Sequence, residues 1–298
     1  MELVDVRCPI CGSGRCKVLY PDSVRENNDG ILRFRQSDPN NTTRRIVKCE
    51  VCGLVYTSPR EDEETLERIY LRVEDNDYLK EQYWKIKTLK FNKKILECYK
   101  DGGRLLDVGC GHGFFLDILD GKWDGFGIDP AISAVNIARQ KGHRAFVSTL
   151  ENAPFKSDYF DCITVFHVLE HVSDPKRFLK KANQLLKDDG LIYLEVPDFG
   201  SAIARLFKRH WWYIMRFHTY YFTRRTLDKI LRKTGFEPLT WLKPTKTWGI
   251  KYITWKLIHF GEPFKIIYEI VELLPLSKIS ITIKAYDQIG VVARKVRS

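Results

Sequence analysis

A short apolar run that ends in an acidic residue and a glycine-rich loop constrains the fold of this chain more than any other feature. Residues 104–110 are expected to form a buried strand, and Asp107 lies near its end. The loop that follows carries glycine at alternate positions: Gly109, Gly111 and Gly113. Glycine permits a sharp turn and lets a ligand approach the backbone amides closely. The pattern therefore predicts a ligand-binding loop between a strand and a helix.

Apolar runs alternate with amphipathic stretches beyond this point, which is typical of a mostly parallel sheet with helices on both faces. We expect an α/β, Rossmann-like fold with seven strands, at residues 104–110, 125–129, 144–148, 160–168, 191–196, 236–242 and 289–296. Helices are expected at residues 114–119, 132–141, 175–187 and 224–234. Capping residues favour two of these helices, because Asp174-Pro175 and Thr223 are typical helix starts and Gly235 is a typical stop.

Two CxxC pairs, each followed by glycine, indicate a metal site near the N-terminus. Each pair makes a tight turn that directs two thiolates to one point, so that four thiolates complete a tetrahedral zinc site. Such a site has no position left for water, and the metal would be structural. The alternatives are unrelated cysteines, a redox pair, or Cys16 in place of one ligand. The predicted zinc ligands are Cys8, Cys11, Cys49 and Cys52.

These features divide the chain into three parts. Residues 1–57 are rich in polar residues and read as an irregular zinc ribbon. Residues 58–103 have helical periodicity with a break near Asn76, and are expected to link the units and cap the ligand site. Residues 104–298 form the main domain, in which residues 243–285 are a basic, aromatic insertion.

The acids beside the glycine loop indicate which ligand it binds. A dinucleotide site prefers GxGxxG and a loop without a carboxylate, because the pyrophosphate is anionic. Here the loop reads GxGxG, residue 115 is Phe, and Asp107 adjoins the loop. A second acid, Asp129, follows about 20 residues later, where a carboxylate meets ribose hydroxyls in this architecture. The site therefore suits S-adenosylmethionine, whose methionine end is cationic.

Residues Leu105–Leu116 resemble motif one of the class I methyltransferases, particularly the methyltransferase 23-type family that includes the ubiquinone-biosynthesis O-methyltransferases. The segments Gly127–Pro130, Phe166–Val172 and His218–Thr223 extend this resemblance. It implies a cofactor over the carboxyl ends of strands one and two, adenine near Glu151 and Asn152, the methionine end bordered by Phe166 and His167, and a pocket closed by Tyr78, Tyr83 or Lys87. The predicted cofactor-binding residues are Asp107, Gly109, Cys110, Gly111, Gly113, Asp129, Pro130, Glu151, Asn152, Phe166, His167, Tyr78 and Lys87.

Histidines near the carboxyl edge of the sheet are the candidates for a general base. The N-terminal cysteines and the Tyr-Phe-Thr segment are similar to a zinc-containing group of deoxysugar C-methyltransferases, and this resemblance places His218 at the position of the base. The chain departs from that group at Phe217, and it lacks the group's large C-terminal domain. His171 is the second candidate and His210 the third, while Glu170 would orient His171 or hold a divalent ion. Each histidine could instead have a purely structural role.

The net charge of +11 indicates an anionic partner, which could be nucleic acid, a phosphorylated metabolite or a membrane surface, and the sign alone does not choose among them. We expect O- or C-methylation of a sugar, a lipid-linked saccharide or a quinone-like molecule. The alternative is an RNA or protein methyltransferase whose zinc module holds the polymer, although strand four lacks the NPPY-type loop of amino-directed enzymes. A binding protein without turnover is a third interpretation, against which the intact loop and both acids argue.

The sequence also bears on location. It has no run of about 18 apolar residues and no evident leader, and its cysteine pattern suits a reducing compartment, so we expect a cytoplasmic protein without a transmembrane segment. The insertion interleaves Trp241, Trp248 and Trp255 with Lys243, Lys246, Lys251 and Lys256. This pattern is typical of peripheral contact with an anionic membrane, and packing against the sheet is the alternative.

Overall fold

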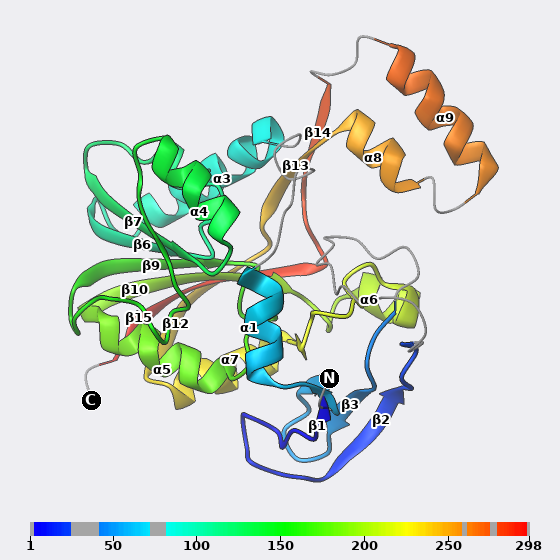
Figure 1. The fold of residues 1–298 in the computed structure, drawn as a ribbon, viewed down its shortest axis with the longest axis horizontal. Helices are drawn as coiled ribbons and strands as arrows, with labels where there is room; N and C mark the ends of the chain where they lie inside the picture. The colour runs from blue at the N-terminus through cyan, green and yellow to red at the C-terminus, as the bar shows by residue number, and fades with distance from the viewer. Residues whose placement is uncertain (1–2, 25–41, 72–81, 258–260, 275–278, 297–298) are drawn as a thin grey trace.

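A seven-stranded sheet forms the centre of the computed structural model, which describes residues 3–24, 42–71, 82–257, 261–274 and 279–296 (Figure 1). The strands lie in the order β12-β15-β10-β9-β6-β7-β8. β15 is antiparallel to β10 and β12, and the other pairings in this sheet are parallel. The Rossmann-like prediction is confirmed. The strands are β6 (Gly103–Val108), β7 (Trp123–Asp129), β8 (Arg144–Val147), β9 (Phe160–Phe166), β10 (Leu186–Pro197), β12 (Phe236–Leu242) and β15 (Gln288–Lys295).

Helices cover both faces of this sheet (Figure 1). Side chains alternate across a strand, so neighbouring residues of β6 enter different cores. Leu106 shares a core with residues of the helices on one face, whereas Leu105 packs in a second core with Leu96 from the other face. The continuous apolar runs of the sequence reflect this burial on both sides. The helices are α3 (Gln82–Glu97) and α4 (Ile132–Gln140) on one face, and α5 (Pro175–Leu185) and α7 (Arg224–Lys233) on the other.

The predicted starts of α5 and α7 are correct, whereas the first predicted helix and the start of β10 differ. Asp174 caps α5 and Thr223 caps α7 through their side chains. The predicted helix 114–119 is only the 3₁₀ turn η1 (Leu116–Ile118), because the amides of Ile118 and Leu119 donate to carbonyls three residues back. β10 begins at Leu186, five residues before the expected 191, with a register shift before the main pairing to β9.

The N-terminal region is a small sheet rather than the irregular segment that its composition indicated. Its strands lie in the order β11-β4-β3-β2, and β11 (Tyr220–Tyr221) is contributed by a distant part of the chain. Ile46 and Val55 are buried with Trp211 and Tyr221 in a common core, so this region does not depend on the cysteines alone. Its own strands are β1 (Leu3–Val4), β2 (Cys16–Tyr20), β3 (Ile46–Cys49), β4 (Val55–Thr57) and β5 (Arg60–Glu61), which pairs with β1.

Two helices occupy the linking region. α1 (Glu63–Leu71) buries Leu66 and Ile69 against Phe217, and α3 follows it in the chain. The expected break near Asn76 lies outside the described residues. Between β10 and β11 the chain also forms the short helix α6 (Ala202–Phe207) and the 3₁₀ turn η2 (Lys208–His210).

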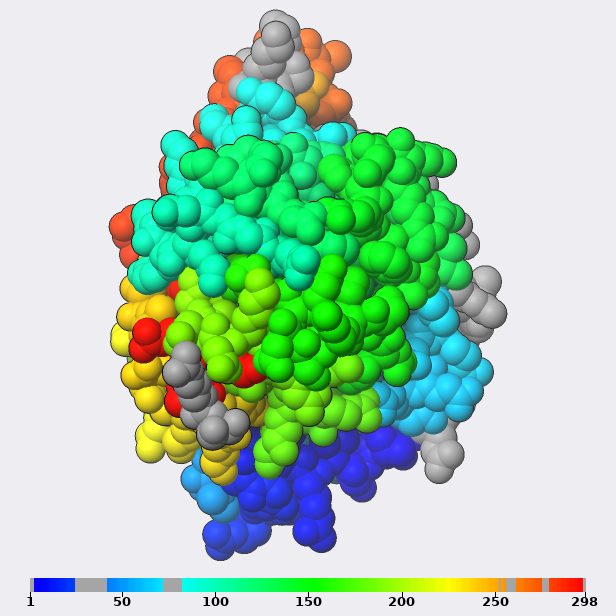
Figure 2. All heavy atoms as spheres, turned by 90° about the vertical axis from the view of Figure 1, so that its left-hand side faces the viewer, coloured from blue at the N-terminus to red at the C-terminus, as the bar shows by residue number. Residues whose placement is uncertain are grey.

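The insertion forms a projecting arm, which we define as β13 (Thr245–Gly249), α8 (Ile250–Leu257), α9 (Glu262–Leu273) and β14 (Ser280–Lys284) (Figure 1). Its stem packs on α3, where the Thr247 amide donates to the Thr88 hydroxyl at 2.9 Å. Figure 2 shows the arm (orange) and the N-terminal region (blue) at opposite ends of the molecule. None of the described helices is long and apolar enough to cross a bilayer.

Candidate active site and metal centre

The glycine loop lies at the carboxyl end of β6, and its path requires glycine. Gly109, Gly111 and Gly113 have φ angles of 73°, 51° and 78°, in the left-handed region. A Cβ on Gly109 would lie only 2.3 Å from Cγ2 of Val168, just beyond the end of β9. The loop is therefore fixed by its own conformation and by close contact with the neighbouring strand end.

Asp107 is buried next to this loop, at 4% exposure. Its Oδ1 accepts a hydrogen bond from the Thr164 hydroxyl at 2.7 Å. Burial raises the pKa of Asp107 to about 7, against the opposing effect of the Thr164 hydrogen bond and with a smaller contribution from the charge of Asp129. A carboxylate held in this way is stabilised by a nearby cationic group.

Asp129 ends the adjacent strand β7 and ties the loop to it. Its Oδ2 accepts from the Gly111 amide at 2.9 Å, and its Oδ1 accepts from the Ala131 amide at 2.8 Å. Burial raises the pKa of Asp129. A carboxylate oxygen has a further lone pair, so the same group can also accept from sugar hydroxyls. The two acids thus flank one loop at adjacent strand ends.

Cys110 and Pro130 are part of this framework. A Cβ on Gly127 would lie 2.7 Å from Sγ of Cys110. The Cys110 side chain therefore packs against β7 at Gly127. Pro130 is half-buried directly after Asp129.

The predicted adenine neighbours lie in a turn after β8. Glu151 is half-buried and Asn152 is exposed, and burial raises the pKa of Glu151. Glu151 also borders a shallow surface hollow whose other lining residues are Asp174, Lys176, Arg177, Lys180, Lys181 and Gln184.

The remaining predicted contacts are dispersed. The Phe166 ring packs edge-on against Phe115 and Tyr193, with centroids 5.3 and 5.1 Å away. Lys87 is exposed on α3, with its ammonium 6.0 Å from the centroid of the Trp84 ring. Tyr78 lies outside the described residues.

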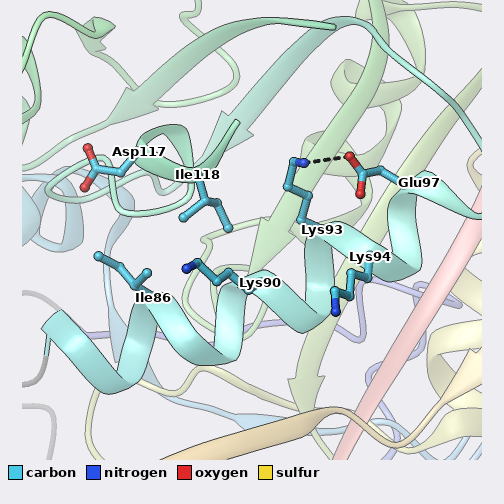
Figure 3. A pocket seen from close by; sticks show the side chains of 7 residues that line it. All are labelled: Ile86, Lys90, Lys93, Lys94, Glu97, Asp117 and Ile118. Carbon is cyan, nitrogen blue, oxygen red and sulfur yellow. Dashed lines mark ion pairs between the residues drawn. The ribbon is translucent and has the colours of Figure 1, made fainter. Parts of the chain in front are cut away.

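A surface hollow between α3 and η1 contains none of the predicted site residues (Figure 3). Lys93 and Glu97 form an ion pair of 2.6 Å across one side of it. We assign this hollow no part in the chemistry. The lining residues are Ile86, Lys90, Lys93, Lys94, Glu97, Asp117 and Ile118.

His167 follows β9 and is held between charged groups. Its φ angle of 57° is unusual for a residue other than glycine. Nε2 lies 3.2 Å from the Lys246 ammonium, which pairs with the fully buried Glu195 at 2.7 Å. Burial, and after it the charge of Lys246, lower the pKa of His167 to about 3. His167 is therefore a neutral imidazole at neutral pH.

The two candidate bases lie together. The rings of His171 and His218 are 4.5 Å apart between centroids and nearly perpendicular. Burial lowers the pKa of both groups, and so both are neutral. Glu170, 1% exposed, lies beside them, and burial raises its pKa to about 7. The third candidate, His210, is exposed on η2 and apart from this cluster.

The four predicted cysteine ligands converge. Their sulfur atoms all lie within 4.8 Å of one another, with Cys8 to Cys52 at 3.3 Å and Cys11 to Cys49 at 3.5 Å. A tetrahedral zinc ion with bonds of about 2.3 Å requires sulfur atoms about 3.8 Å apart, so the geometry fits. Exposed Cys16 is not in this set.

Each CxxC turn is closed by its glycine. The amides of Gly12 and Gly53 donate to the carbonyls of Cys8 and Cys49 at 2.7 and 3.0 Å. Burial raises the pKa of Cys49, but the amides of Cys52 and Val51 more than offset it and bring the pKa to about 7. Amide donors of this kind favour the thiolate form that a metal needs.

Sequence reasoning missed three polar residues of this region. Thr164 bonds Asp107, and Lys246 pairs with Glu195 beside His167. Glu195 offered a signal, because it is an acid within an otherwise apolar strand. Lys243 and Lys246 were expected to face lipid, but they pair with Asp198 and Glu195 at 3.0 and 2.7 Å, which corrects that part of the insertion's interpretation.

One family model and several known proteins are similar to this chain. The family model Methyltransf_23, described as a methyltransferase domain, matches residues 81–240, more than half of the chain. An uncharacterised protein of Methanocaldococcus jannaschii is 38% identical over 101 residues, 33% of this chain and 39% of that protein. A ubiquinone biosynthesis O-methyltransferase of Glaesserella parasuis is 31% identical over 105 residues, 31% of this chain and 44% of that protein.

A solved structure supports the fold. The S-adenosylmethionine-dependent methyltransferase of Thermotoga maritima is 23% identical and aligns with a TM-score of 0.51, over 78% of this chain and 100% of its own. The chain spans less than half the length of the two curated relatives above. The family model identifies a methyltransferase domain, and the solved structure supports its fold.

Asp107→Asn is expected to stabilise the cofactor-free protein at pH 8 by up to ~4 kcal/mol, since a pKa raised by about three units corresponds to that free energy. The pKa of Asp107 is higher in the folded than in the unfolded protein. The unmodified protein therefore has its full stability below about pH 4 and loses this contribution as the pH rises through 7. The gain should therefore shrink towards pH 4. Urea denaturation at pH 5 and pH 8 measures it.

The exposed Asp101→Asn serves as the control, with an expected change below ~0.5 kcal/mol at both pH values. A loss of stability in Asp107→Asn at pH 8, or an equal gain at both pH values, would contradict the raised pKa of Asp107.

Proposed function

Because the chain belongs to the Methyltransf_23 family of methyltransferase domains, we propose that it binds S-adenosylmethionine at the glycine loop and methylates a small-molecule acceptor. The carboxylates of Asp107 and Asp129 on either side of the loop carry this proposal. Asp107 suits the cationic methionine end, and Asp129 suits the ribose hydroxyls. The pyrophosphate of a dinucleotide would instead lie close to the Asp107 carboxylate, and the two negative charges would repel each other.

The cofactor supplies a methyl group bound to a positively charged sulfur. This chain's residues hold it, align it with the acceptor and exclude water. We place the reacting atom of the acceptor against the neutral histidines His171 and His218, which can take a proton or orient a hydroxyl. His171 follows β9, the strand next to the glycine loop, and the His218 ring lies 4.5 Å from the His171 ring.

An anionic, amphiphilic acceptor fits the surface around α6 and η2. Arg205, Lys208 and Arg209 are exposed there, beside Leu206 at 76% exposure and Trp212 at 43%. Arg216, in the same region, pairs with the buried Glu61 at 3.1 Å. A phosphorylated or lipid-linked saccharide, or a quinone-like molecule with an anionic group, combines the two properties that this surface offers.

Transfer of labelled methyl groups from S-adenosylmethionine tests this function. A lysate fractionated into lipid, metabolite, nucleic acid and protein pools should be labelled in the lipid or metabolite pool. Gly109→Ala should lose at least ~100-fold in rate, because the added Cβ collides with Val168 and strains a left-handed residue. Gly121→Ala is the matched control, since a Cβ there meets nothing within 4 Å. Label confined to RNA or protein would refute the small-molecule acceptor and support the alternative.

We also propose that the four cysteines hold a structural zinc ion. All four positions of a tetrahedral ion are then occupied by sulfur, and no position remains for water. The two turns are also joined to α7: Lys229 donates to the Cys52 carbonyl at 3.4 Å, and Lys233 donates to the Ile10 carbonyl at 3.0 Å. Order at the metal site thereby supports a helix of the methyltransferase domain.

Cys52→Ser should lose the zinc and more than ~4 kcal/mol of stability, because a metal-linked core is disrupted. Cys16→Ser should keep both. Metal content by atomic spectroscopy and the denaturation midpoint measure the two effects. Zinc retained by Cys52→Ser, or lost by Cys16→Ser, would contradict the assigned ligand set.

The arm is proposed to contact an anionic membrane surface. Its helix α9 exposes Ile266, Ile270 and Leu273, at 54%, 52% and 87%. Lys251 and Lys265 lie on the same arm, where each is 3.7 Å from a glutamate, Glu272 and Glu262 respectively. An exposed apolar helix face with lysines nearby suits the boundary between headgroups and acyl chains. The contact therefore rests on α9 rather than on the tryptophan and lysine repeat.

Ile270→Glu is expected to reduce co-flotation with phosphatidylglycerol-rich vesicles at least ~10-fold, because a charge enters the apolar layer. Val18→Glu is the matched control, since Val18 is 56% exposed on β2 at the other end of the molecule. Equal flotation of Ile270→Glu and the unmodified protein would exclude α9 as the contact.

A further inference from the structure

We propose that Glu170, His171 and His218 form a binding site for a divalent cation that holds the oxygen atoms of the acceptor. One ligand atom from each residue lies within 4.8 Å of the other two. The inference rests on the proposed function, because the cation would bind and activate the hydroxyl of the acceptor in the proposed methyl transfer. It is distinct from the cysteine centre, which lies in the N-terminal region.

The backbone holds these ligands in place before any ion binds. The Glu170 carbonyl accepts hydrogen bonds from the amides of Thr219 and Tyr220 at 2.8 and 3.2 Å. The Thr219 hydroxyl donates to the same carbonyl at 3.0 Å. The segment that carries His218 is therefore fastened to the segment that carries Glu170. A preorganised ligand set of this kind is what tight metal binding requires.

Two of the ligands have buried polar atoms that make no hydrogen bond. Glu170 is 1% exposed and neither carboxylate oxygen accepts a hydrogen bond, although Oε1 lies 3.3 Å from Nδ1 of His167. Nδ1 of His218, a residue that is 4% exposed, also has no hydrogen-bond partner. Buried polar atoms of folded proteins are almost always bonded. A cation between Glu170 and His218 would supply the missing partner to both.

The third ligand is oriented by its surroundings. Nδ1 of His171 lies 3.0 Å from the carbonyl oxygen of Phe217, which can only accept a hydrogen bond. Nδ1 therefore carries the proton and donates, and Nε2 keeps its lone pair for a metal ion. The Tyr70 hydroxyl, 3.1 Å from the same nitrogen, braces the ring. Metal-binding histidines are commonly held by a backbone carbonyl in this way.

The ligand types indicate the class of metal and of acceptor. Two imidazoles with one carboxylate suit Mn²⁺, Fe²⁺ or Zn²⁺ better than Ca²⁺, which prefers oxygen ligands throughout. Three protein ligands leave positions open for two oxygens of a substrate. We therefore infer an acceptor with two neighbouring oxygen donors, at least one of them a hydroxyl, such as a catechol or a vicinal diol.

This arrangement favours O-methylation. A hydroxyl bound to a divalent cation has a lowered pKa, and its proton passes to water. The oxygen then forms a bond to the methyl carbon while the sulfur–methyl bond breaks, and the electron pair of that bond remains on sulfur. Charge and atoms balance without an oxidant or a reductant.

Titration with Mn²⁺ followed by electron paramagnetic resonance tests the site, because free hexaaqua Mn²⁺ gives a signal that is lost on binding. The full-length, zinc-loaded protein is used, and the hard Mn²⁺ ion competes poorly for four thiolates. We expect one Mn²⁺ per chain, with at least tenfold weaker binding in Glu170→Gln and His218→Ala. His210→Ala, which removes an exposed histidine outside the cluster, should bind Mn²⁺ as the unmodified chain does.

Glu170→Gln preserves the size of the side chain, and circular dichroism checks that each variant is folded. The titration contains no S-adenosylmethionine, so its result is independent of the proposed function. Absence of Mn²⁺ binding to the unmodified chain, or binding that Glu170→Gln and His218→Ala leave unchanged, overturns the cation site. If transfer then still proceeds, the histidines act directly on the acceptor and the proposed function stands.

Discussion

The site depends on two carboxylates that meet one glycine loop at the ends of adjacent parallel strands. Asp129 bonds the Gly111 amide and so ties the loop to β7, while Asp107 is kept beneath the same loop by burial and by Thr164. Three left-handed glycines make that approach sterically feasible. The strand order places β9, and with it the segment that leads to His171, beside the same loop.

The N-terminal region also positions the segment that carries His218. β11 pairs with β4, so that Tyr220 lies opposite Tyr56, and His218 precedes this strand by two residues. The same stretch is bonded to the Glu170 carbonyl. The small sheet and the Rossmann-like sheet therefore hold the histidine cluster from two sides. Disorder at the cysteines should consequently disturb the position of His218.

Local patterns were sufficient for the main sheet but not for pairings between distant residues. The strand near Asp107, the glycine loop and the caps of α5 and α7 follow from short windows of sequence, and the structure agrees with each. β11 could not be found in this way, because two tyrosines become a strand only through pairing with β4. The ion pair of Lys246 with Glu195 likewise joins the insertion to the middle of the sheet.

The site prediction divides in the same manner. The proximity of Asp107 and Asp129 to the glycine loop, and the convergence of the four cysteines, could be expected from spacing, because each acid lies near the end of a strand and each cysteine pair lies in one turn. His171 and His218 could be named as candidates, but their proximity depends on how the chain returns to the edge of the sheet. The roles of the predicted site residues, from Asp107, Asp129 and the cysteines to His218, Glu151 and Lys87, stay predictions.

Calorimetric titration of the zinc-loaded protein with S-adenosylmethionine, and separately with NAD⁺, tests the central claim most directly. The account predicts binding of one S-adenosylmethionine per chain and no heat from NAD⁺, because Asp107 favours a cation and disfavours a pyrophosphate. Binding of NAD⁺ without any heat from S-adenosylmethionine would contradict it.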